Sequence, residues 1–241
     1  MPNPSLRHRL KPWLPPALVR IYRRRRGDPR ADPQFTLPAR SLAELWPTPA
    51  AAELALPLSL AARADEWAMP AAELLAMAAI CVLAQPRRVF EIGTYTGETT
   101  RVIARNTLAD ARVDTLDLAP DEFARRVGRP PHYVAGSAFH GTPEAQKIAQ
   151  HAVGAGGFDF APFAGQYDLV FVDADHRYPA VKADSEQALR LARPGGAIVW
   201  DDYVWDERHP ECAGVTTYLN ELVRDLPIYR IAGTRLAWAR V

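Results

Sequence analysis

One stretch of this 241-residue chain decides its fold: Val89-Phe90-Glu91-Ile92-Gly93-Thr94-Tyr95-Thr96-Gly97-Glu98-Thr99-Thr100. It begins with an apolar run of strand length, passes through two glycines, and ends where helical spacing begins. Glycine lets a backbone turn sharply and approach a ligand closely. The stretch therefore predicts a strand, a ligand-binding turn and a helix, with an ordinary tight turn as the alternative.

The spacing of these residues excludes two phosphate-binding motifs. A P-loop would need Gly-Lys-Ser/Thr from position 98, where this chain has Glu98, and the dinucleotide pattern G-x-G-x-x-G would need glycine where it has Tyr95. The acidic Glu91 before the turn would also lie poorly beside a pyrophosphate. A carboxylate at this position favours a cationic or amino-bearing ligand.

Around and beyond the turn, short apolar runs alternate with helical segments. The expected strands cover 88–92, 113–118, 132–135, 167–172, 197–200, 228–231 and 236–239. The expected helices cover 97–106, 120–125, 143–151, 179–191 and 213–225. This alternation predicts an α/β fold with a Rossmann-like, doubly wound, mostly parallel seven-stranded sheet. The last two strands are too close for a crossover helix, so we expect a C-terminal antiparallel hairpin around Gly233.

The N-terminal part of the chain divides into two further regions before the predicted domain at 86–241. Residues 41–85 have helical spacing, most clearly after Pro70, and predict a helical cover. Residues 1–40 form a Pro/Arg-rich arm with ten basic and two acidic side chains. We expect this arm to be solvated or to make weak contacts with a membrane surface or a protein, and the apolar helix allows a homodimer. No pattern typical of nucleic-acid binding is present, so we expect no nucleic acid as a partner.

Composition narrows the class of protein further. The two cysteines, Cys81 and Cys212, are too few for a disulfide framework and predict reduced thiols in an intracellular protein. The longest apolar stretch, 74–84, is about half the roughly 20 residues of a membrane span. The first residues do not resemble a secretion signal. We therefore expect a soluble, cytoplasmic protein.

Acidic residues follow three of the predicted strands. Asp117 closes one apolar run and can accept hydrogen bonds from the two hydroxyls of a ribose. Asp173 follows another strand, and Asp201 and Asp202 follow the next. Carboxylates at neighbouring strand ends fit one hard cation such as Mg²⁺, with helix or loop capping as the alternative.

At this point the chain resembles a known family. Glu91-Ile-Gly-Thr-Tyr-Thr-Gly looks like the cofactor loop of class I S-adenosylmethionine-dependent methyltransferases. Tyr95 makes it similar to the metal-dependent O-methyltransferases of the catechol/caffeoyl-CoA type and the related sugar and antibiotic-tailoring enzymes. That group places one metal aspartate after the fourth strand, and an Asp followed by Asp or Asn 28 and 29 residues later, which Asp173, Asp201 and Asp202 match. The resemblance covers roughly residues 70–241.

The resemblance implies roles for particular residues. Those expected around the methionine half of S-adenosylmethionine are Glu91, Gly93, Thr94, Tyr95, Gly97 and Thr99. Asp117 would hold the ribose, and Ser137 and Ala138 would border the adenine. Those expected to hold Mg²⁺ or Mn²⁺ are Asp173, Asp201 and Asp202. Asp173 would also be catalytic together with His176, which stands where many relatives have a lysine as general base and which titrates near neutral pH. Trp205 matches a tryptophan of several relatives.

These observations predict an S-adenosylmethionine-dependent O-methyltransferase, assisted by Mg²⁺, that acts on a small catechol-like or sugar acceptor with neighbouring hydroxyls. One alternative is a metal-free methyltransferase with His176 as base, because the Asp-x-Asp-His-x-Tyr stretch also resembles a branch that does not always use metal. Another is a non-catalytic nucleoside-binding or scaffold protein that docks through its basic arm. The acceptor pocket is expected from the N-terminal helices and the 158–166 and 203–211 loops, whose aromatic side chains fit either a flat ring or core packing.

Overall fold

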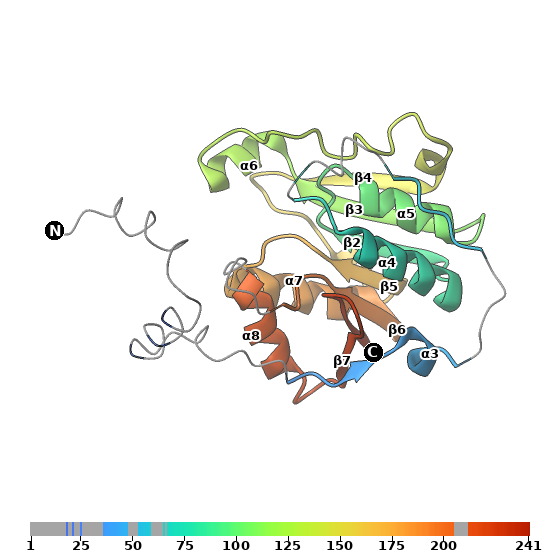
Figure 1. Ribbon diagram of the computed structural model, residues 1–241. Coiled ribbons are helices and arrows are strands. Elements are labelled where there is room, and N and C mark those ends of the chain that lie inside the picture. The colour runs from blue at the N-terminus through green and yellow to red at the C-terminus, as the bar shows by residue number, and fades with distance from the viewer. Residues whose placement is uncertain are drawn as a thin grey trace.

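A mixed sheet of eight strands in the order β1-β7-β8-β6-β5-β2-β3-β4 forms the centre of the computed structural model (Figure 1). The model describes residues 18, 21, 25, 36–47, 53–58, 65, 67–204 and 212–241. The strands are β1 (Ala39–Arg40), β2 (Arg88–Ile92), β3 (Arg112–Leu118), β4 (Ile148–Val153), β5 (Tyr167–Val172), β6 (Ala192–Trp200), β7 (Ile228–Ile231) and β8 (Ala237–Arg240). The helices are α3 (Leu42–Leu45), α4 (Ala71–Ala84), α5 (Glu98–Asn106), α6 (Pro120–Val127), α7 (Tyr178–Leu191) and α8 (Ala213–Leu222).

The strand order places a topological switch point beside β2. From β2 the chain continues to β3 and β4 on one side, and then returns to β5 and β6 on the other, all in parallel pairs. β8 runs antiparallel to both β6 and β7. Open sheets of this kind bind ligands beyond the carboxyl ends of the strands at the switch point. The predicted Rossmann-like fold and its C-terminal hairpin are confirmed.

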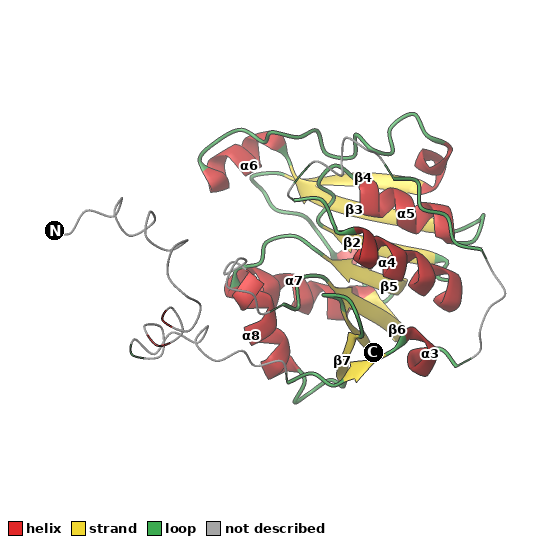
Figure 2. Cartoon of the chain, in the orientation of Figure 1, coloured by secondary structure: helices red, strands yellow, loops and turns green. Residues whose placement is uncertain are grey.

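Helices lie on both faces of the sheet (Figure 2), and the core accordingly consists of two layers, one on each face. Alternate residues of a strand point to opposite faces. In β6, Ile198 and Trp200 therefore pack in the cluster that includes side chains of α7 and α8, whereas Val199 packs in the cluster that includes α4 and α5. Both faces of the central strands are buried, which explains their nearly continuous apolar sequences.

An eighth strand, β1, lies within the segment predicted to be a basic arm. It pairs in parallel with β7, and the neighbouring Leu37 is buried. The Leu37 amide donates a hydrogen bond of 3.2 Å to the hydroxyl of Tyr203. Most of residues 1–35 lie outside the described residues, so their predicted contacts stay predictions.

Two predicted elements between β3 and β5 are wrong. Residues 132–135 form turns rather than a strand, and the predicted helix 143–151 is a short 3-10 helix, Pro143–Lys147, followed by the strand β4. β4 is an edge strand with a polar outer side, so it lacks the apolar run by which the other strands were predicted. One of its polar residues, His151, is held by Asp114 of β3 through a contact of 2.8 Å between Nε2 and Oδ1.

None of the helices in the described part of the chain has the length and apolar character needed to cross a bilayer.

Gly93 allows the carboxyl ends of β2 and β5 to meet. Its φ is +106°, and a Cβ atom there would lie 1.9 Å from the carbonyl oxygen of Asp173. Backbone hydrogen bonds also join the strand ends here. The Gly93 amide donates to Leu116 O at 2.8 Å, and the Asp173 amide donates to Ile92 O at 2.9 Å. No side chain fits here without moving the two loops apart.

Gly93→Ala should therefore lower the free energy of unfolding by about 3 kcal/mol or more, from steric overlap together with backbone strain. Denaturant unfolding measures this loss. Gly128→Ala is the matched control, because Gly128 also has positive φ but a Cβ atom there meets nothing within 4 Å. The control should cost about 1–2 kcal/mol. Equal losses in the two variants would contradict the close approach.

Candidate functional site

The turn after β2 is the first part of the candidate site. Tyr95 has a φ of +50°, and its amide donates a hydrogen bond of 2.8 Å to Oδ2 of Asp117 at the end of β3. The loop at 136–138 lies against the same turn, because the Gly136 amide donates to Tyr95 O at 3.0 Å and the Ala138 amide donates to Thr96 O at 2.8 Å. The structure therefore brings Asp117, and the loop with Ser137 and Ala138, to the glycine turn. A Cβ atom on Gly97 would overlap the ring of Phe139, at 2.5 Å from its Cδ1.

Glu91, the acidic residue before the turn, is completely buried. The hydroxyls of Thr100 and Thr115 both donate to its Oε2, whereas its Oε1 has no hydrogen-bond partner among the described residues. Burial raises the pKa of Glu91 to about 8, against the two threonine hydrogen bonds, which lower it. Glu91 thus keeps its proton near neutral pH in this state.

Thr94 and Thr99, both expected near the methionine half of the donor, occupy different positions. Thr94 is buried, and its hydroxyl lies 2.7 Å from that of Thr115, so its side chain supports the turn from inside. The hydroxyl of Thr99, in α5, lies 3.8 Å from the sulfur of Met69. Burial also raises the pKa of Asp117, although the amides of Leu118 and Tyr95 donate to its carboxylate and oppose this shift.

Three carboxylates form the second part of the site, across the switch point from Asp117. Asp173 follows β5, and Asp201 and Asp202 follow β6, with carboxylate oxygens that all lie within 4.8 Å of one another. Asp201 and Asp202 are buried, whereas the side chain of Asp173 is 25% exposed. Burial, and then the charges of Asp173 and Asp202, raise the pKa of Asp201 well above its usual range. This crowding of negative charge requires a positive partner.

Arg235 supplies one positive charge and was not predicted from the sequence. It lies in the turn between β7 and β8, and its Nη1 is 2.7 Å from Oδ1 of Asp202. Its other guanidinium nitrogens lie 3.7 Å from Asp201 Oδ2 and 3.6 Å from Oε1 of Glu73 in α4. The hairpin itself was predicted, but nothing local to Arg235 indicates that the hairpin returns to the ends of β5 and β6.

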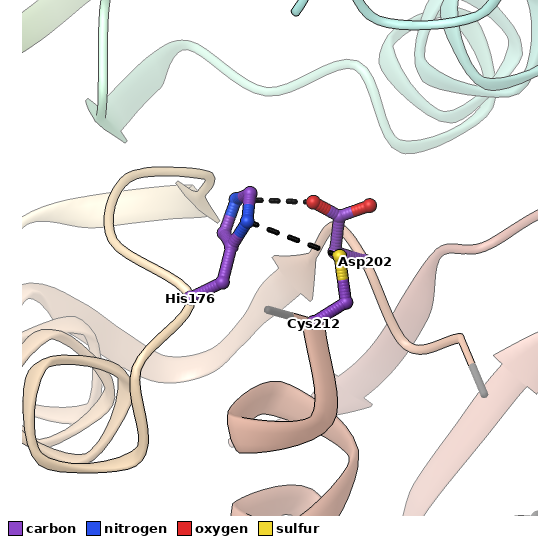
Figure 3. A group of neighbouring side chains, drawn as sticks. All are labelled: His176, Asp202 and Cys212. Carbon is purple, nitrogen blue, oxygen red and sulfur yellow. Dashed lines mark hydrogen bonds and ion pairs between the residues drawn. The ribbon is translucent and has the colours of Figure 1, made fainter. Parts of the chain in front are cut away.

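His176 supplies the second positive charge. Its Nε2 lies 3.0 Å from Asp202 Oδ2 and 3.9 Å from Asp173 Oδ1, and its Nδ1 lies 3.9 Å from the sulfur of Cys212 (Figure 3). Burial lowers the pKa of His176, but the neighbouring carboxylates of Asp173 and Asp202 outweigh burial and raise it. For Asp202, burial raises the pKa, but the contact with His176 outweighs it, and the net shift is downward. His176 is therefore an imidazolium in this arrangement.

An aromatic cluster adjoins the glycine turn and was also not predicted. The ring of Tyr95 lies 4.5 Å from that of Tyr133, and Trp67 packs edge-on against His132 at 4.8 Å between ring centroids. The Tyr95 hydroxyl donates to a carboxylate oxygen of Asp65. These side chains come from the segment before α4 and the loop after α6, so only the folded chain places them together.

The aromatic residues of the 158–166 loop lie elsewhere. Phe158, Phe160 and Phe163 pack around Phe90 in the core, with Phe163 5.8 Å from Phe90. These rings belong to the same core cluster as Tyr167, which is the first residue of β5. Asp173 of the candidate site comes after the last residue of β5, at the other end of the strand. Core packing is thus the alternative that the structure supports for these rings. Trp205 lies outside the described residues.

The raised pKa of Glu91 predicts a pH dependence. Between its ordinary value of 4.5 and about 8, the folded state keeps a proton that the unfolded state has lost. The contribution of Glu91 to stability therefore falls as pH rises through this window, by about 1.4 kcal/mol per pH unit. Glu91→Gln should remove this fall, as measured by unfolding at pH values across the window. Exposed Glu53 offers the control, since Glu53→Gln should keep the wild-type slope. An unchanged slope in Glu91→Gln would contradict the burial of a titrating carboxyl.

The comparisons with known proteins agree with this geometry. A family model described as a methyltransferase domain matches residues 90–203. Catechol O-methyltransferase of Mycobacterium tuberculosis is 35% identical over 130 residues, which cover 52% of this chain and 53% of that protein. Tricin synthase 1 of Oryza sativa subsp. japonica is 30% identical over 141 residues, which cover 56% of this chain and 51% of that protein. The chain thus spans about half the length of these curated relatives.

A solved structure shows the same fold. The O-methyltransferase TomG from Streptomyces achromogenes, determined in complex with SAM, superimposes with a TM-score of 0.54 at 23% identity, covering 73% of this chain and 82% of that one. At this identity the likeness concerns the fold alone. Residues 90–203 thus match a methyltransferase domain, and this part of the chain is similar to O-methyltransferases of the catechol/caffeoyl-CoA type.

Proposed function

We propose that the protein transfers the methyl group of S-adenosylmethionine to a hydroxyl oxygen of a small acceptor with neighbouring hydroxyls, assisted by Mg²⁺ or Mn²⁺. One observation carries this proposal: a cluster of three carboxylates lies directly across the switch point from the glycine turn. The family and the catechol O-methyltransferase relative support the reaction class. The TomG structure, which contains SAM, supports the methyl donor.

The donor would lie along the glycine turn, beside the loop at 136–138 that is hydrogen-bonded to it. Gly93 and Gly97 let this turn pack closely against the Asp173 carbonyl and the Phe139 ring, which sets the shape of the turn. Asp117, whose Oδ2 already accepts the Tyr95 amide, would hold the ribose. The amino-bearing methionine half would lie near the turn, within reach of Glu91, Thr94 and Thr99.

The cluster of Asp173, Asp201 and Asp202 fits a hard divalent cation. Mg²⁺ prefers carboxylate oxygens, and these three side chains offer them within 4.8 Å of one another. Burial, and then their mutual repulsion, raise the pKa of Asp201, and a bound cation would offset both effects. When bound, such an ion lowers the pKa of an acceptor hydroxyl and orients two neighbouring oxygens.

Three side chains beside the proposed cation would position the acceptor and remove its proton. Arg235 holds Asp202 from one side, at 2.7 Å, and so fixes the carboxylate beside His176. His176 would take the proton from the acceptor hydroxyl, which requires a neutral imidazole. Added positive charge at the carboxylates lowers the pKa of His176, because it weakens the attraction that now keeps His176 protonated. Asp173, the most exposed of the three carboxylates, would face the acceptor.

A metal-free methyltransferase is the second candidate, and one observation favours it. Arg235 and His176 together already contribute two positive charges beside the three carboxylates. In this version His176 would act as base without a cation, and acceptors other than vicinal hydroxyls would be open to the enzyme.

Binding of Mn²⁺ separates the two candidates. With the protein saturated in S-adenosylhomocysteine, the free-ion paramagnetic resonance signal should decrease by one bound Mn²⁺ per chain. Asp201→Asn should lose this ion and keep the affinity for S-adenosylhomocysteine. Asp175→Asn is the matched control, since Asp175 lies near the cluster but pairs with Arg177. No Mn²⁺ binding would favour the metal-free candidate, and no binding of S-adenosylhomocysteine would contradict methyl transfer altogether.

Arg235 provides a test that needs neither donor nor acceptor. Arg235→Gln should lower the free energy of unfolding by about 2 kcal/mol in chelator, because it leaves the buried Asp201 and Asp202 with less compensation. Added Mg²⁺ should then raise the melting temperature of this variant more than that of the wild type. Arg193→Gln is the control, because Arg193 is 52% exposed and pairs with Asp168 at the opposite end of β5. Equal Mg²⁺ shifts in Arg235→Gln and wild type would contradict a cation site at these carboxylates.

A further inference from the structure

Asp202 belongs to a second group of ligand atoms in addition to the three carboxylates. His176, Asp202 and Cys212 offer a nitrogen, an oxygen and a sulfur that all lie within 4.8 Å of one another (Figure 3). The three residues come from separate elements: the loop between β5 and α7, the end of β6, and the residue before α8. Only the tertiary fold places these donors together.

Backbone packing holds this group in place. Gly214, in the first turn of α8, is so close to the loop at His176 that a Cβ atom would lie 2.2 Å from the His176 carbonyl oxygen and 2.4 Å from the Tyr178 amide nitrogen. This contact fixes Cys212 beside His176. Asp202 and Cys212 are buried, whereas the His176 side chain is 29% exposed, so an ion can enter from the solvent past the imidazole.

This mixture of nitrogen, oxygen and sulfur donors favours a different class of ion than the three carboxylates do. Imidazole nitrogen, thiolate sulfur and carboxylate oxygen together suit Zn²⁺ and Co²⁺, whereas Mg²⁺ takes oxygen ligands. Ligand atoms around a tetrahedral Zn²⁺ lie about 3.4–3.6 Å apart, given metal–ligand bonds of about 2.0–2.3 Å. In the present arrangement, one donor atom of each residue lies within 4.8 Å of the other two, with His176 Nε2 at 3.0 Å from Asp202 Oδ2 and His176 Nδ1 at 3.9 Å from Cys212 Sγ. A small rotation of the imidazole would direct one of its nitrogens to the shared ion.

We propose that His176, Asp202 and Cys212 form a site for a borderline divalent cation of the Zn²⁺ class, with water as the fourth ligand. As the ion binds, the Cys212 thiol and the His176 imidazolium each give one proton to solvent, and the sulfur and one ring nitrogen form bonds to the metal. Because Asp202 is shared, an ion here excludes one from the three-carboxylate cluster. This exclusion rests on the proposed function, whereas the binding of Zn²⁺ does not. The protein would then be inhibited by Zn²⁺ and restored by a chelator together with Mg²⁺.

Cobalt is the probe for the sulfur ligand, since Co²⁺ bound to a thiolate absorbs in the near ultraviolet. The 241-residue chain, reduced and freed of metal, should develop this charge-transfer band with one equivalent of Co²⁺. Equimolar Zn²⁺ should remove the band, and excess Mg²⁺ should leave it. Cys212→Ser should lose the band and bind Co²⁺ at least about 100-fold more weakly, because even outer partners of metal ligands contribute 10–100-fold.

Two further variants make the assignment specific. Cys81→Ala should keep the band, since Cys81 is buried in α4 and burial raises its pKa to about 12. Asp201→Asn should also keep the band, because Asp201 belongs only to the carboxylate cluster. Circular dichroism confirms that each variant is folded. If Cys212→Ser does not fold, X-ray absorption of the wild type with one equivalent of Zn²⁺ decides, since one sulfur in the first shell is expected.

The outcomes are distinct from those for methyl transfer. A band that persists in Cys212→Ser, or a zinc shell without sulfur, would overturn the site whatever the enzyme does. Exclusion is tested by Mn²⁺ release: one equivalent of Zn²⁺ should free the bound Mn²⁺ in the wild type and not in Cys212→Ser. Simultaneous binding of both ions to the wild type would overturn the sharing of Asp202. Absence of Mn²⁺ binding at the outset would instead contradict the metal-assisted function and leave the Co²⁺ result standing.

Discussion

The close approach of Gly93 to the carbonyl of Asp173 is the constraint on which the rest of the site depends. It holds the ends of β2 and β5 together at the switch point, where the chain turns from one half of the sheet to the other. Because of this contact, the turn that would bind the methyl donor lies directly beside the carboxylates that would face the acceptor. Transfer of a methyl group requires the two reactants to be held in contact, and under the proposed function this backbone contact would set their spacing.

Charge is the second constraint, and it concerns the buried ends of β5 and β6. Asp201 and Asp202 lie in the interior beside Asp173, and burial of uncompensated carboxylates is costly. Arg235 and His176 supply compensation from the hairpin and from the loop after β5. The network extends to Glu73 of α4, whose carboxylate accepts the Arg235 amide at 3.1 Å. Helix α4, the C-terminal hairpin and the candidate site are thereby coupled electrostatically.

Asp202 belongs to both groups of possible metal ligands in the site. One of its oxygens faces Arg235, and the other faces His176 beside Cys212. The same carboxylate can thus complete an all-oxygen set with Asp173 and Asp201, or a mixed set with imidazole and thiol. Its left-handed backbone, with a φ of +59°, and its buried position keep it at this junction. A single side chain therefore connects the proposed magnesium chemistry to the proposed sensitivity toward zinc.

Local residue patterns by themselves determined much of this protein. Strands β2, β5 and β7 match their predicted bounds, and the glycine turn and the aspartates at the strand ends lie where periodicity and residue type placed them. Their signals are local, because an apolar run, a glycine and a following carboxylate are adjacent in the chain. The tertiary structure decided the rest: the edge strands β1 and β4, the aromatic cluster at Tyr95, and the arrival of Arg235 and Cys212 beside Asp202. These features depend on contacts between segments far apart in the chain, and no residue near Arg235 or Cys212 in the sequence reveals which carboxylate it will meet.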